Sequence, residues 1–458
     1  MTTIRFLGGT DTVTGSKFLV ESDRGSVLVD CGMFQGPREV RQLNWDDPFF
    51  SAAPLPDEVL ITHAHIDHTG WLPRLVGTHG FDGPIRCTAA TADLLAIMLP
   101  DSARIQEEDA AYANKKGYSR HDPALPLYTE ADAFRTLDLL RPVGYHEWVD
   151  TAAGRARWTF AGHILGSAHI ALDDGDRQMV FSGDVGRWDI PVLKDPEPPT
   201  GADLLLIEST SGGRLHNEDT DPDTGIEEAV NRIAARDGVL VIPAFSIGRT
   251  QEILFRIRSH EDEGRIPELP VILDSPMAID ATEQYARHHE EHDLEVKALE
   301  AAGTNPLRPA RLKFTHTVEE SKAINRRREA MVVISASGMA TGGRVPHHLK
   351  RRLPYPENLV AFVGYQAHGT LGRRLVEGEG RVRIHGEDIE VRAEVTRLEA
   401  LSAHADQEEL IRWVSEAVPE RIALVHGEDE GREALAEAFR ARFDAEVLLP
   451  MRGDVVDV

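Results

Sequence analysis

The chain has 458 residues, of which 41% are hydrophobic and 28% charged, and its formal net charge is −26 at pH 7. This composition is that of an ordinary globular protein too long for one small core, so two domains are expected. The negative charge argues against a non-specific basic nucleic-acid-binding protein, but it is compatible with a nuclease whose groove is locally basic and holds metal ions.

The apolar runs and the cysteines indicate the compartment. The chain has no run of about 20 apolar residues, so neither a membrane-spanning segment nor a membrane partner is expected. Its start lacks the apolar core and the cleavage site of a secretory signal peptide. The two cysteines, Cys31 and Cys87, do not make a disulfide framework, which favours the reducing cytoplasm.

The first part of the chain, to about residue 208, is a series of short β runs with intervening helices. Many of the β runs are bounded by Gly, Asp or Pro, as strands commonly are. They lie at 4–7, 18–21, 26–30, 59–62, 168–172, 179–182 and 204–208. Helical patterns are predicted at about 89–98, 101–116 and 129–139.

From about residue 209 the pattern changes to helices that alternate with fully apolar strands. The strands are predicted at 239–242, 271–273, 331–335 and 359–363, and such alternation is typical of a parallel sheet flanked by helices. An antiparallel pattern follows near 380–400. The chain then ends with a helix from about Asp406, a strand at 421–425, a helix at 429–442 and a strand at 446–449. The simplest arrangement is an α/β protein in which one domain interrupts another.

The most informative motif is the hexad His63-Ala-His65-Ile-Asp67-His68, which directly follows the apolar run 59–61. Imidazole and carboxylate groups are the ligands that a pair of zinc-like ions prefers. In an extended segment His63 and His65 point the same way and can share one ion. Asp67 and His68 follow a turn and can reach a second ion.

Further candidate ligands stand at the ends of predicted strands, at Asp30, His163, Asp184 and His426. Taken singly, each is more often a capping or turn residue. Together with the hexad, they predict a metal centre at one edge of the sheets.

These motifs resemble those of the metallo-β-lactamase superfamily, in its β-CASP branch of RNA-processing nucleases. The resemblance is closest to the short prokaryotic relatives of the pre-mRNA 3′-end cleavage endonuclease, and it extends from about residue 4 to about residue 450. The motifs that carry it are Asp30 (Leu28-Val-Asp-Cys-Gly), the hexad, His163 (Ala-Gly-His-Ile-Leu-Gly), Asp184 (Ser-Gly-Asp-Val-Gly), Glu208 (Glu-Ser-Thr), His404 (Leu-Ser-Ala-His-Ala-Asp) and His426 (Leu-Val-His-Gly-Glu).

The resemblance implies an αββα sandwich, formed by residues 1–208 and 395–458, with an inserted β-CASP domain at 209–394. It also implies two zinc ions per chain. One would be bound by His63, His65, His163 and Asp184, and the other by Asp67, His68, Asp184 and His426. Asp30 would orient the bridging water or a ligand imidazole. Two such ions can hold a bridging hydroxide and position a phosphodiester for in-line attack.

The same resemblance implies a general acid. His404 would protonate the leaving oxygen, and Glu208 would keep it charged. With Asp30 and Asp67, these two residues complete the expected catalytic set. The alternative is that His404 only neighbours the N-cap of the helix near Asp406. Many relatives read Glu-Ser-Thr-Tyr-Gly-Asp-Arg where this chain reads Glu208-Ser-Thr-Ser-Gly-Gly-Arg214, a difference that concerns packing near the domain junction rather than the metal ligands.

The expected partner is single-stranded RNA. The glycine-rich segment 335–344, with Ser337 and Gly338, precedes a helix and can offer backbone N–H groups to a phosphate. Arg249, Arg344 and Arg373 are predicted to contact the RNA backbone. The function that follows is a zinc-dependent endoribonuclease, with 5′–3′ exonuclease activity and a homodimer left open. The alternatives are a non-catalytic RNA-binding subunit, or a hydrolase of this fold that acts on DNA or a small molecule.

Overall fold

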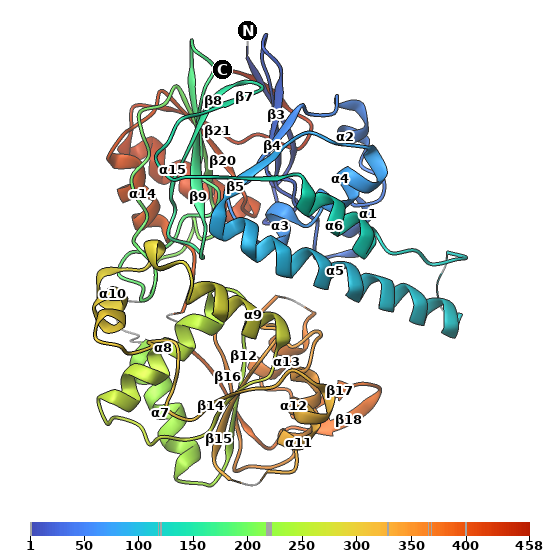
Figure 1. Cartoon of the computed structure of the whole chain (residues 1–458), viewed down its shortest axis with the longest axis vertical. Coiled ribbons are helices and arrows are strands. Elements are labelled where there is room, and N and C mark those ends of the chain that lie inside the picture. The colour runs from blue at the N-terminus through green and yellow to red at the C-terminus, as the bar shows by residue number, and fades with distance from the viewer. Residues whose placement is uncertain are drawn as a thin grey trace. The chain divides into compact units, whose positions relative to one another are not determined.

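The computed structural model describes residues 2–117, 119, 121–216, 222–327, 329–364, 366–367, 369–398 and 401–458. Contacts divide the chain into two compact units (Figure 1). Unit 1 consists of Met1–Asp189, Asp195–Leu215 and His404–Val458, and unit 2 consists of Ile190–Lys194 and His216–Ala403. The chain therefore leaves unit 1, builds unit 2 and returns.

Unit 1 contains two mixed β-sheets. The first has the strand order β22-β1-β2-β3-β4-β5-β6, with bounds β1 Thr3–Gly8, β2 Lys17–Glu21, β3 Ser26–Val29, β4 Glu58–Leu60, β5 Ile85–Thr88, β6 Leu140–Val143 and β22 Val455–Asp457. The second has the order β21-β20-β11-β10-β9-β8-β7, with bounds β7 Val149–Thr151, β8 Gly154–Phe160, β9 Ala168–Asp173, β10 Gln178–Phe181, β11 Leu204–Glu208, β20 Arg421–Val425 and β21 Glu446–Leu448.

The two sheets pack face to face because alternate residues of each strand point to opposite faces. On β11, Leu204 and Leu206 enter a core between the sheets, which they share with Phe6 and Phe18 of the first sheet. The other residues of the strand, such as Leu205, pack in a second core under α14 (Gln407–Ser415) and α15 (Asp429–Arg442). With the helices beside the first sheet, unit 1 is an αββα sandwich, which confirms the predicted fold class.

The helices associated with the first sheet are short except for one. They are α1 (Arg38–Gln42), α2 (Pro48–Ala52), α3 (Ile66–Thr69), α4 (Leu72–His79), α5 (Ala89–Lys116) and α6 (Glu130–Asp138). The prediction of two helices at 89–98 and 101–116 was wrong, since α5 continues through Pro100. A proline inside a helix costs about 3 kcal/mol. Apolar residues on both sides of Pro100, among them Leu99 and Ala103, are completely buried, and this packing offsets the cost.

Unit 2 is built on a parallel sheet with the strand order β14-β13-β15-β12-β16-β19. The strands are β12 Val239–Pro243, β13 Val271–Leu273, β14 Leu312–Phe314, β15 Met331–Ser335, β16 Leu359–Phe362 and β19 Glu394–Arg397. An antiparallel pair, β17 (Arg381–Ile384) and β18 (Glu387–Glu390), falls between β16 and β19 in the sequence. The antiparallel pattern was predicted in this region.

Helices cover both faces of this sheet. The helices α7 (Pro222–Ala234), α8 (Arg249–Asp262) and α9 (Pro276–Tyr285) contribute to one core. The helices α11 (Val318–Ile324), α12 (Val345–Arg352) and α13 (Leu371–Val376) contribute to the other. A short 3₁₀ turn, η1 (His289–Glu291), and α10 (Leu294–Ala301) follow α9. None of the helices that the structure describes is long and apolar enough to span a lipid bilayer.

Candidate metal centre

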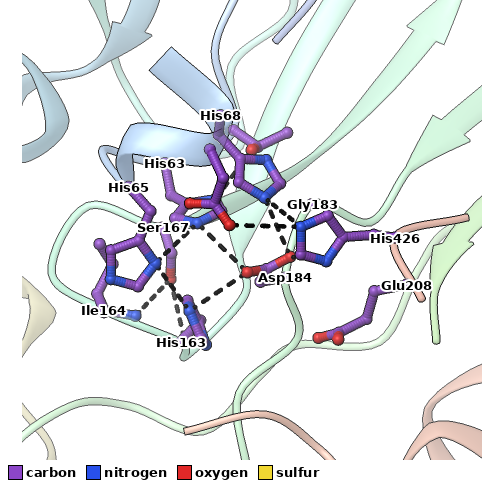
Figure 2. A network of polar contacts seen from close by, with 12 residues as sticks. His63, His65, His68, His163, Ile164, Ser167, Gly183, Asp184, Glu208 and His426 are labelled. Carbon is purple, nitrogen blue, oxygen red and sulfur yellow. Dashed lines mark hydrogen bonds and ion pairs between the residues drawn. The ribbon is translucent and has the colours of Figure 1, made fainter. Parts of the chain in front are cut away.

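The candidate ligands of unit 1 follow the carboxyl ends of strands, where loops bring them together (Figure 2). The hexad follows β4, and its last residues begin α3. Asp30 follows β3 and His426 follows β20, and both have a positive φ, of 59° and 50°. Non-glycine residues adopt this conformation uncommonly, so it marks tight turns in which the surrounding structure fixes the direction of the side chain.

The first cluster consists of His63, His65, His163 and Asp184, whose ligand atoms all lie within 4.8 Å of one another. The Nδ1 atom of His65 is 3.2 Å from the Nε2 atoms of both His63 and His163. These two Nε2 atoms are each 3.5 Å from Oδ2 of Asp184. Ligand atoms about 2.0–2.1 Å from a tetrahedral zinc ion would lie about 3.3 Å from one another. The spacing therefore fits a single tetrahedral ion.

The second cluster consists of Asp67, His68 and His426. The Nε2 atoms of the two histidines are 3.2 Å apart, and that of His426 is 3.6 Å from Oδ2 of Asp67. Asp184 also contributes here, since its Oδ1 atom is 3.3 Å from Nε2 of His68 and 3.3 Å from Nδ1 of His426. The carboxylate of Asp184 thus has one oxygen at each cluster.

The environment of Asp184 is suited to cations. Its side chain is 1% exposed, and its buried Oδ1 atom makes no hydrogen bond to any group that the structure describes. Burial favours the neutral carboxyl, but the imidazoles around it, above all those of His426 and His68, hold its pKa well below the usual value of 3.8. A buried carboxylate needs paired charge or a metal ion. The residues present therefore fit metal ions at both clusters.

Hydrogen bonds behind the ligands fix which ring nitrogen faces the centre. Nδ1 of His68 donates to Oδ2 of Asp30 at 2.7 Å. The hydroxyl of Thr62 donates to Asp30 and lies 3.0 Å from Nδ1 of His63, so it accepts from that ring. The hydroxyl of Thr210 lies 3.1 Å from Nδ1 of His426 and donates to the carbonyl of the same residue at 3.1 Å. In each case we infer a proton on Nδ1 and a lone pair on Nε2, as metal ligation requires.

The titration of the imidazoles follows from these partners. Burial, together with the neighbouring His68, lowers the pKa of His63 well below 6.5, which keeps that ring neutral. Burial also disfavours a charge on His68, but the carboxylates of Asp184 and Asp30 more than offset this and raise its pKa well above 6.5. A protonated His68 therefore supplies the positive charge next to Asp184 and Asp30 that a metal ion would otherwise supply.

His404 and Glu208 lie next to the first cluster. Nδ1 of His404 is 3.0 Å and 3.2 Å from the two carboxylate oxygens of Glu208 and 3.9 Å from Oδ2 of Asp184. Glu208 is fully buried and also accepts from the backbone N–H of Val185 at 2.6 Å. Burial opposes a charge on His404, but Glu208 and Asp184 outweigh it and raise the pKa of His404 to about 9. The N-cap of α14 is formed by Asp406, with Glu409 completing a capping box.

The structure brings together every ligand expected from the sequence, and it adds two residues that the sequence analysis did not name. Thr62 joins Asp30 to His63, and Thr210 contacts His426. Thr62 directly precedes the hexad, and Thr210 is the last residue of the Glu-Ser-Thr motif. Their adjacency to expected ligands was the available signal.

The residues expected to contact RNA lie in unit 2, and the three arginines are paired with carboxylates. Arg344 is 2.7 Å from the buried Asp274 and also donates to the backbone carbonyls of residues 315 and 316. Arg249 pairs with Glu252. Arg373 pairs at 2.6 Å with Glu377, which directly follows its helix, while 41% of the Arg373 side chain is exposed. Among these arginines, only Arg373 presents much of its side chain to solvent.

The glycine-rich turn of unit 2 is held by its own hydrogen bonds. The hydroxyl of Ser337 accepts from the backbone N–H groups of Thr341 and Gly342 at 3.2 and 3.3 Å. Gly338 is buried, and a Cβ atom there would lie 3.1 Å from the ring of Phe245. A larger residue at 338 would therefore force this ring or the turn to move.

Family comparisons cover nearly the whole chain. Residues 11–244 match the metallo-beta-lactamase superfamily. Residues 250–375 match the Beta-Casp domain, and residues 388–450 match the Zn-dependent metallo-hydrolase RNA specificity domain. With the αββα sandwich and the His and Asp clusters, these matches define a metallo-β-lactamase-fold metallohydrolase. More narrowly, the chain belongs to the β-CASP branch of that superfamily, the RNA-processing nucleases.

Individual relatives match over the full chain. Ribonuclease TTHA0252 of Thermus thermophilus is 39% identical over 98% of this chain and 99% of its own length. Transcription termination factor FttA of Methanocaldococcus jannaschii is 30% identical over 99% of this chain and 71% of its own length. A crystal structure of a protein of unknown function from Enterococcus faecalis V583 covers 99% of both chains with a TM-score of 0.57 and 13% identity, a likeness that shows the fold alone.

Proposed function

We propose that the chain is a metal-dependent ribonuclease that hydrolyses phosphodiester bonds of single-stranded RNA in RNA processing or decay. The observation that carries the proposal is the pair of ligand clusters that share Asp184, with the His404–Glu208 pair beside them. The RNA substrate is supported by the RNA specificity domain and by the relative named as a ribonuclease. Endonuclease activity is the expected mode, and 5′–3′ exonuclease activity is left open.

We infer two zinc ions per chain, one for each cluster. The ligand atoms are nitrogen and oxygen only, a set that suits zinc and leaves its Lewis acidity high. Such ions, when bound, would lower the pKa of water and stabilise the charge that develops on the phosphate. Asp30, Thr62 and Thr210 would keep the ligand imidazoles in the required tautomer.

His404 is suited to the proton transfer that completes the cleavage. Its Nδ1 atom is engaged by Glu208, which leaves Nε2 to hold the proton that the leaving oxygen takes up. Attack of water on phosphorus with departure of the 3′-oxygen gives a 5′-phosphate and a 3′-hydroxyl, and it does not use the 2′-hydroxyl of the RNA as the nucleophile. A positioned general acid contributes about 100- to 10,000-fold to such a step.

Unit 2 would provide the RNA track, with Ser337 and Arg373 as its accessible parts, while Arg249, Arg344 and the buried Gly338 stay predictions as contacts. The domain bounds 1–208, 209–394 and 395–458 and a homodimer also stay predictions. We place the activity in the cytoplasm, in keeping with two cysteines that are both free and buried. A non-catalytic RNA-binding subunit is the main alternative, and the complete ligand set argues against it.

The test is digestion of 5′-end-labelled single-stranded RNA by the full-length protein as purified, after chelation, and after return of Zn²⁺. A variant with His63→Ala and His65→Ala, purified in parallel, controls for contaminating ribonucleases. We expect cleavage that is lost with the chelator, restored by zinc, absent in the variant, and that leaves 5′-phosphate ends. Cleavage that survives chelation, or products with 2′,3′-cyclic phosphates, would overturn the proposal.

A further inference from the structure

A second set of potential metal ligands lies in unit 2 and consists of His289, His292 and Glu300. His289 belongs to η1, His292 directly follows that turn, and Glu300 lies near the end of α10. Figure 1 labels α10. Each of the three residues offers one ligand atom, and these atoms all lie within 4.8 Å of one another. None of them takes part in the metal centre of unit 1 or is among the residues of the RNA track proposed for unit 2.

The carboxylate of Glu300 has one histidine at each oxygen. Nδ1 of His289 is 3.0 Å from Oε2, and Nδ1 of His292 is 3.1 Å from Oε1. Each separation joins one histidine to a different oxygen of Glu300, and each is close to the spacing of about 3.3 Å between two ligand atoms of a tetrahedral zinc ion. The side chain of His292 is 1% exposed, that of Glu300 21% and that of His289 61%. The cluster is therefore anchored in the protein on one side and open to solvent on the other.

The tautomer of a neutral His292 leaves its contact with Glu300 without a hydrogen bond. Nε2 of His292 is 2.8 Å from the backbone carbonyl oxygen of Tyr285. A carbonyl oxygen only accepts, so Nε2 carries a proton. The buried Nδ1 atom makes no hydrogen bond to any described group, although a carboxylate oxygen is only 3.1 Å away. In the neutral ring a lone pair on Nδ1 faces the lone pairs of that oxygen, and a cation between them removes the repulsion.

This arrangement is the one in which metal-binding histidines are commonly found, with one nitrogen on the ion and the other donating to a backbone carbonyl. The backbone around His292 is also fixed. The backbone N–H of Asp293 donates to the carbonyl of Val192, and that of Lys194 donates to the carbonyl of Glu291. The carboxylate of Asp293 caps α10 through Val296 at 2.7 Å. The ligand positions are therefore held in place by backbone contacts rather than by an ion alone.

We propose that His289, His292 and Glu300 form an additional binding site for a divalent transition-metal ion, with zinc as the expected ion. Two imidazoles and one carboxylate are a known protein ligand set for zinc, and a water molecule completes the four positions. The local charge is favourable, because the same segment carries Glu290, Glu291 and Glu295. The ion would join η1 to the end of α10, and this inference does not depend on the proposed ribonuclease activity.

The test is equilibrium dialysis of the full-length protein against solutions of buffered free Zn²⁺, with bound zinc counted per chain. His289→Ala removes an exposed ligand, and Glu300→Gln keeps the side-chain volume, so both variants should fold. The matched control is His288→Ala, because the Nδ1 atom of that neighbouring histidine is 2.9 Å from Glu290 rather than from Glu300. The zinc-dependent rise in melting temperature provides a second readout.

We expect the wild type and His288→Ala to bind one more zinc ion per chain than His289→Ala and Glu300→Gln. Loss of a ligand should weaken this site by about 100-fold or more, since even an outer partner is worth about 10–100-fold. The stoichiometry of the unit 1 clusters should be the same in all four proteins. Equal zinc binding by the wild type and both ligand variants, or an equal loss in His288→Ala, would overturn the proposal.

Discussion

Replacing Asp30 by asparagine removes none of the expected metal ligands, yet it should weaken metal binding at the cluster that contains His68. The two oxygens of Asp30 act only as acceptors. Oδ1 accepts from the backbone N–H of Thr62 at 2.9 Å and from its hydroxyl at 3.1 Å, and Oδ2 accepts from Nδ1 of His68 at 2.7 Å. An amide of the same size has one acceptor and one donor, so it cannot satisfy both sides.

Either orientation of the amide in Asp30→Asn is costly. If its nitrogen faces His68, Nδ1 of that ring must accept, and the proton moves to Nε2, which can then no longer bind the ion. If the nitrogen faces Thr62, two N–H donors meet in a buried site, and leaving a buried donor without an acceptor costs about 1–3 kcal/mol. Loss of an outer partner of a metal ligand typically weakens metal binding about 10–100-fold, or about 1.4–2.7 kcal/mol.

The assay is competition for Zn²⁺ between the protein and a chelator of known affinity, followed through both binding steps. The control is Asp57→Asn, because Asp57 is a surface acceptor for Ser26 at 2.8 Å and is not among the residues of either cluster. We expect one step to weaken about 10–100-fold in Asp30→Asn, with the other step and the control unchanged. Unchanged affinity in both steps, or an equal loss in both, would refute the assigned role of Asp30.

Three other predictions separate roles that the structure assigns. His404→Ala should lower cleavage about 100- to 10,000-fold at unchanged zinc content, and zinc loss in proportion to activity would contradict it. Arg344→Ala should lower the free energy of unfolding by about 1.5–3 kcal/mol, since it removes one charged donor from the buried Asp274, which keeps its contacts with His348, Thr315 and Ser321. Arg373→Ala should instead weaken RNA binding at unchanged stability. The third concerns Lys17, whose side chain is 1% exposed and whose pKa is lowered by burial from 10.5 to about 8. Between pH 8 and pH 10.5 the unfolded chain binds the proton at Lys17 and the folded chain does not. The difference in the free energy of unfolding between the wild type and Lys17→Met should therefore rise by about 3 kcal/mol over this range in favour of the wild type. Below pH 8 this difference should not change with pH. A difference that falls with pH in urea titrations would contradict this sign.

The candidate metal ligands could be predicted from the sequence because their positions are set locally. A polar residue directly after an apolar strand must lie at the strand's end, and parallel neighbours bring such ends to one edge of a sheet. The hexad and Asp184 follow this rule, and the structure places them together. The helix from Asp406 was predictable for a similar reason, since its capping box is contained within four residues.

Other features depend on contacts between distant parts of the chain. Arg344 looked like a phosphate contact because it precedes a helix, but its partner Asp274 is 70 residues away. The histidines at 289 and 292 are visible in the sequence, but their relation to Glu300 depends on how η1 leads into α10. Separate helices were predicted at 89–98 and 101–116, but tertiary packing lets α5 continue through Pro100. In each case the deciding interaction lies outside the window that a local pattern covers.

The charge of the centre gives a reason why so acidic a chain can bind an anionic polymer. Two divalent ions would bring four positive charges, and Asp30, Asp67 and Asp184 bring three negative ones, while Glu208 is balanced by a protonated His404. While the bound water is neutral, the centre then has one positive charge to offer to a phosphodiester, although the chain as a whole carries −26. Without ions, the three carboxylates and a protonated His68 would leave it with two negative charges, which repel the phosphate. Chelation should therefore weaken RNA binding as well as stop cleavage, and fluorescence anisotropy with an uncleavable single-stranded analogue should detect the loss. RNA affinity that is unchanged by chelation would place the binding energy outside the metal centre.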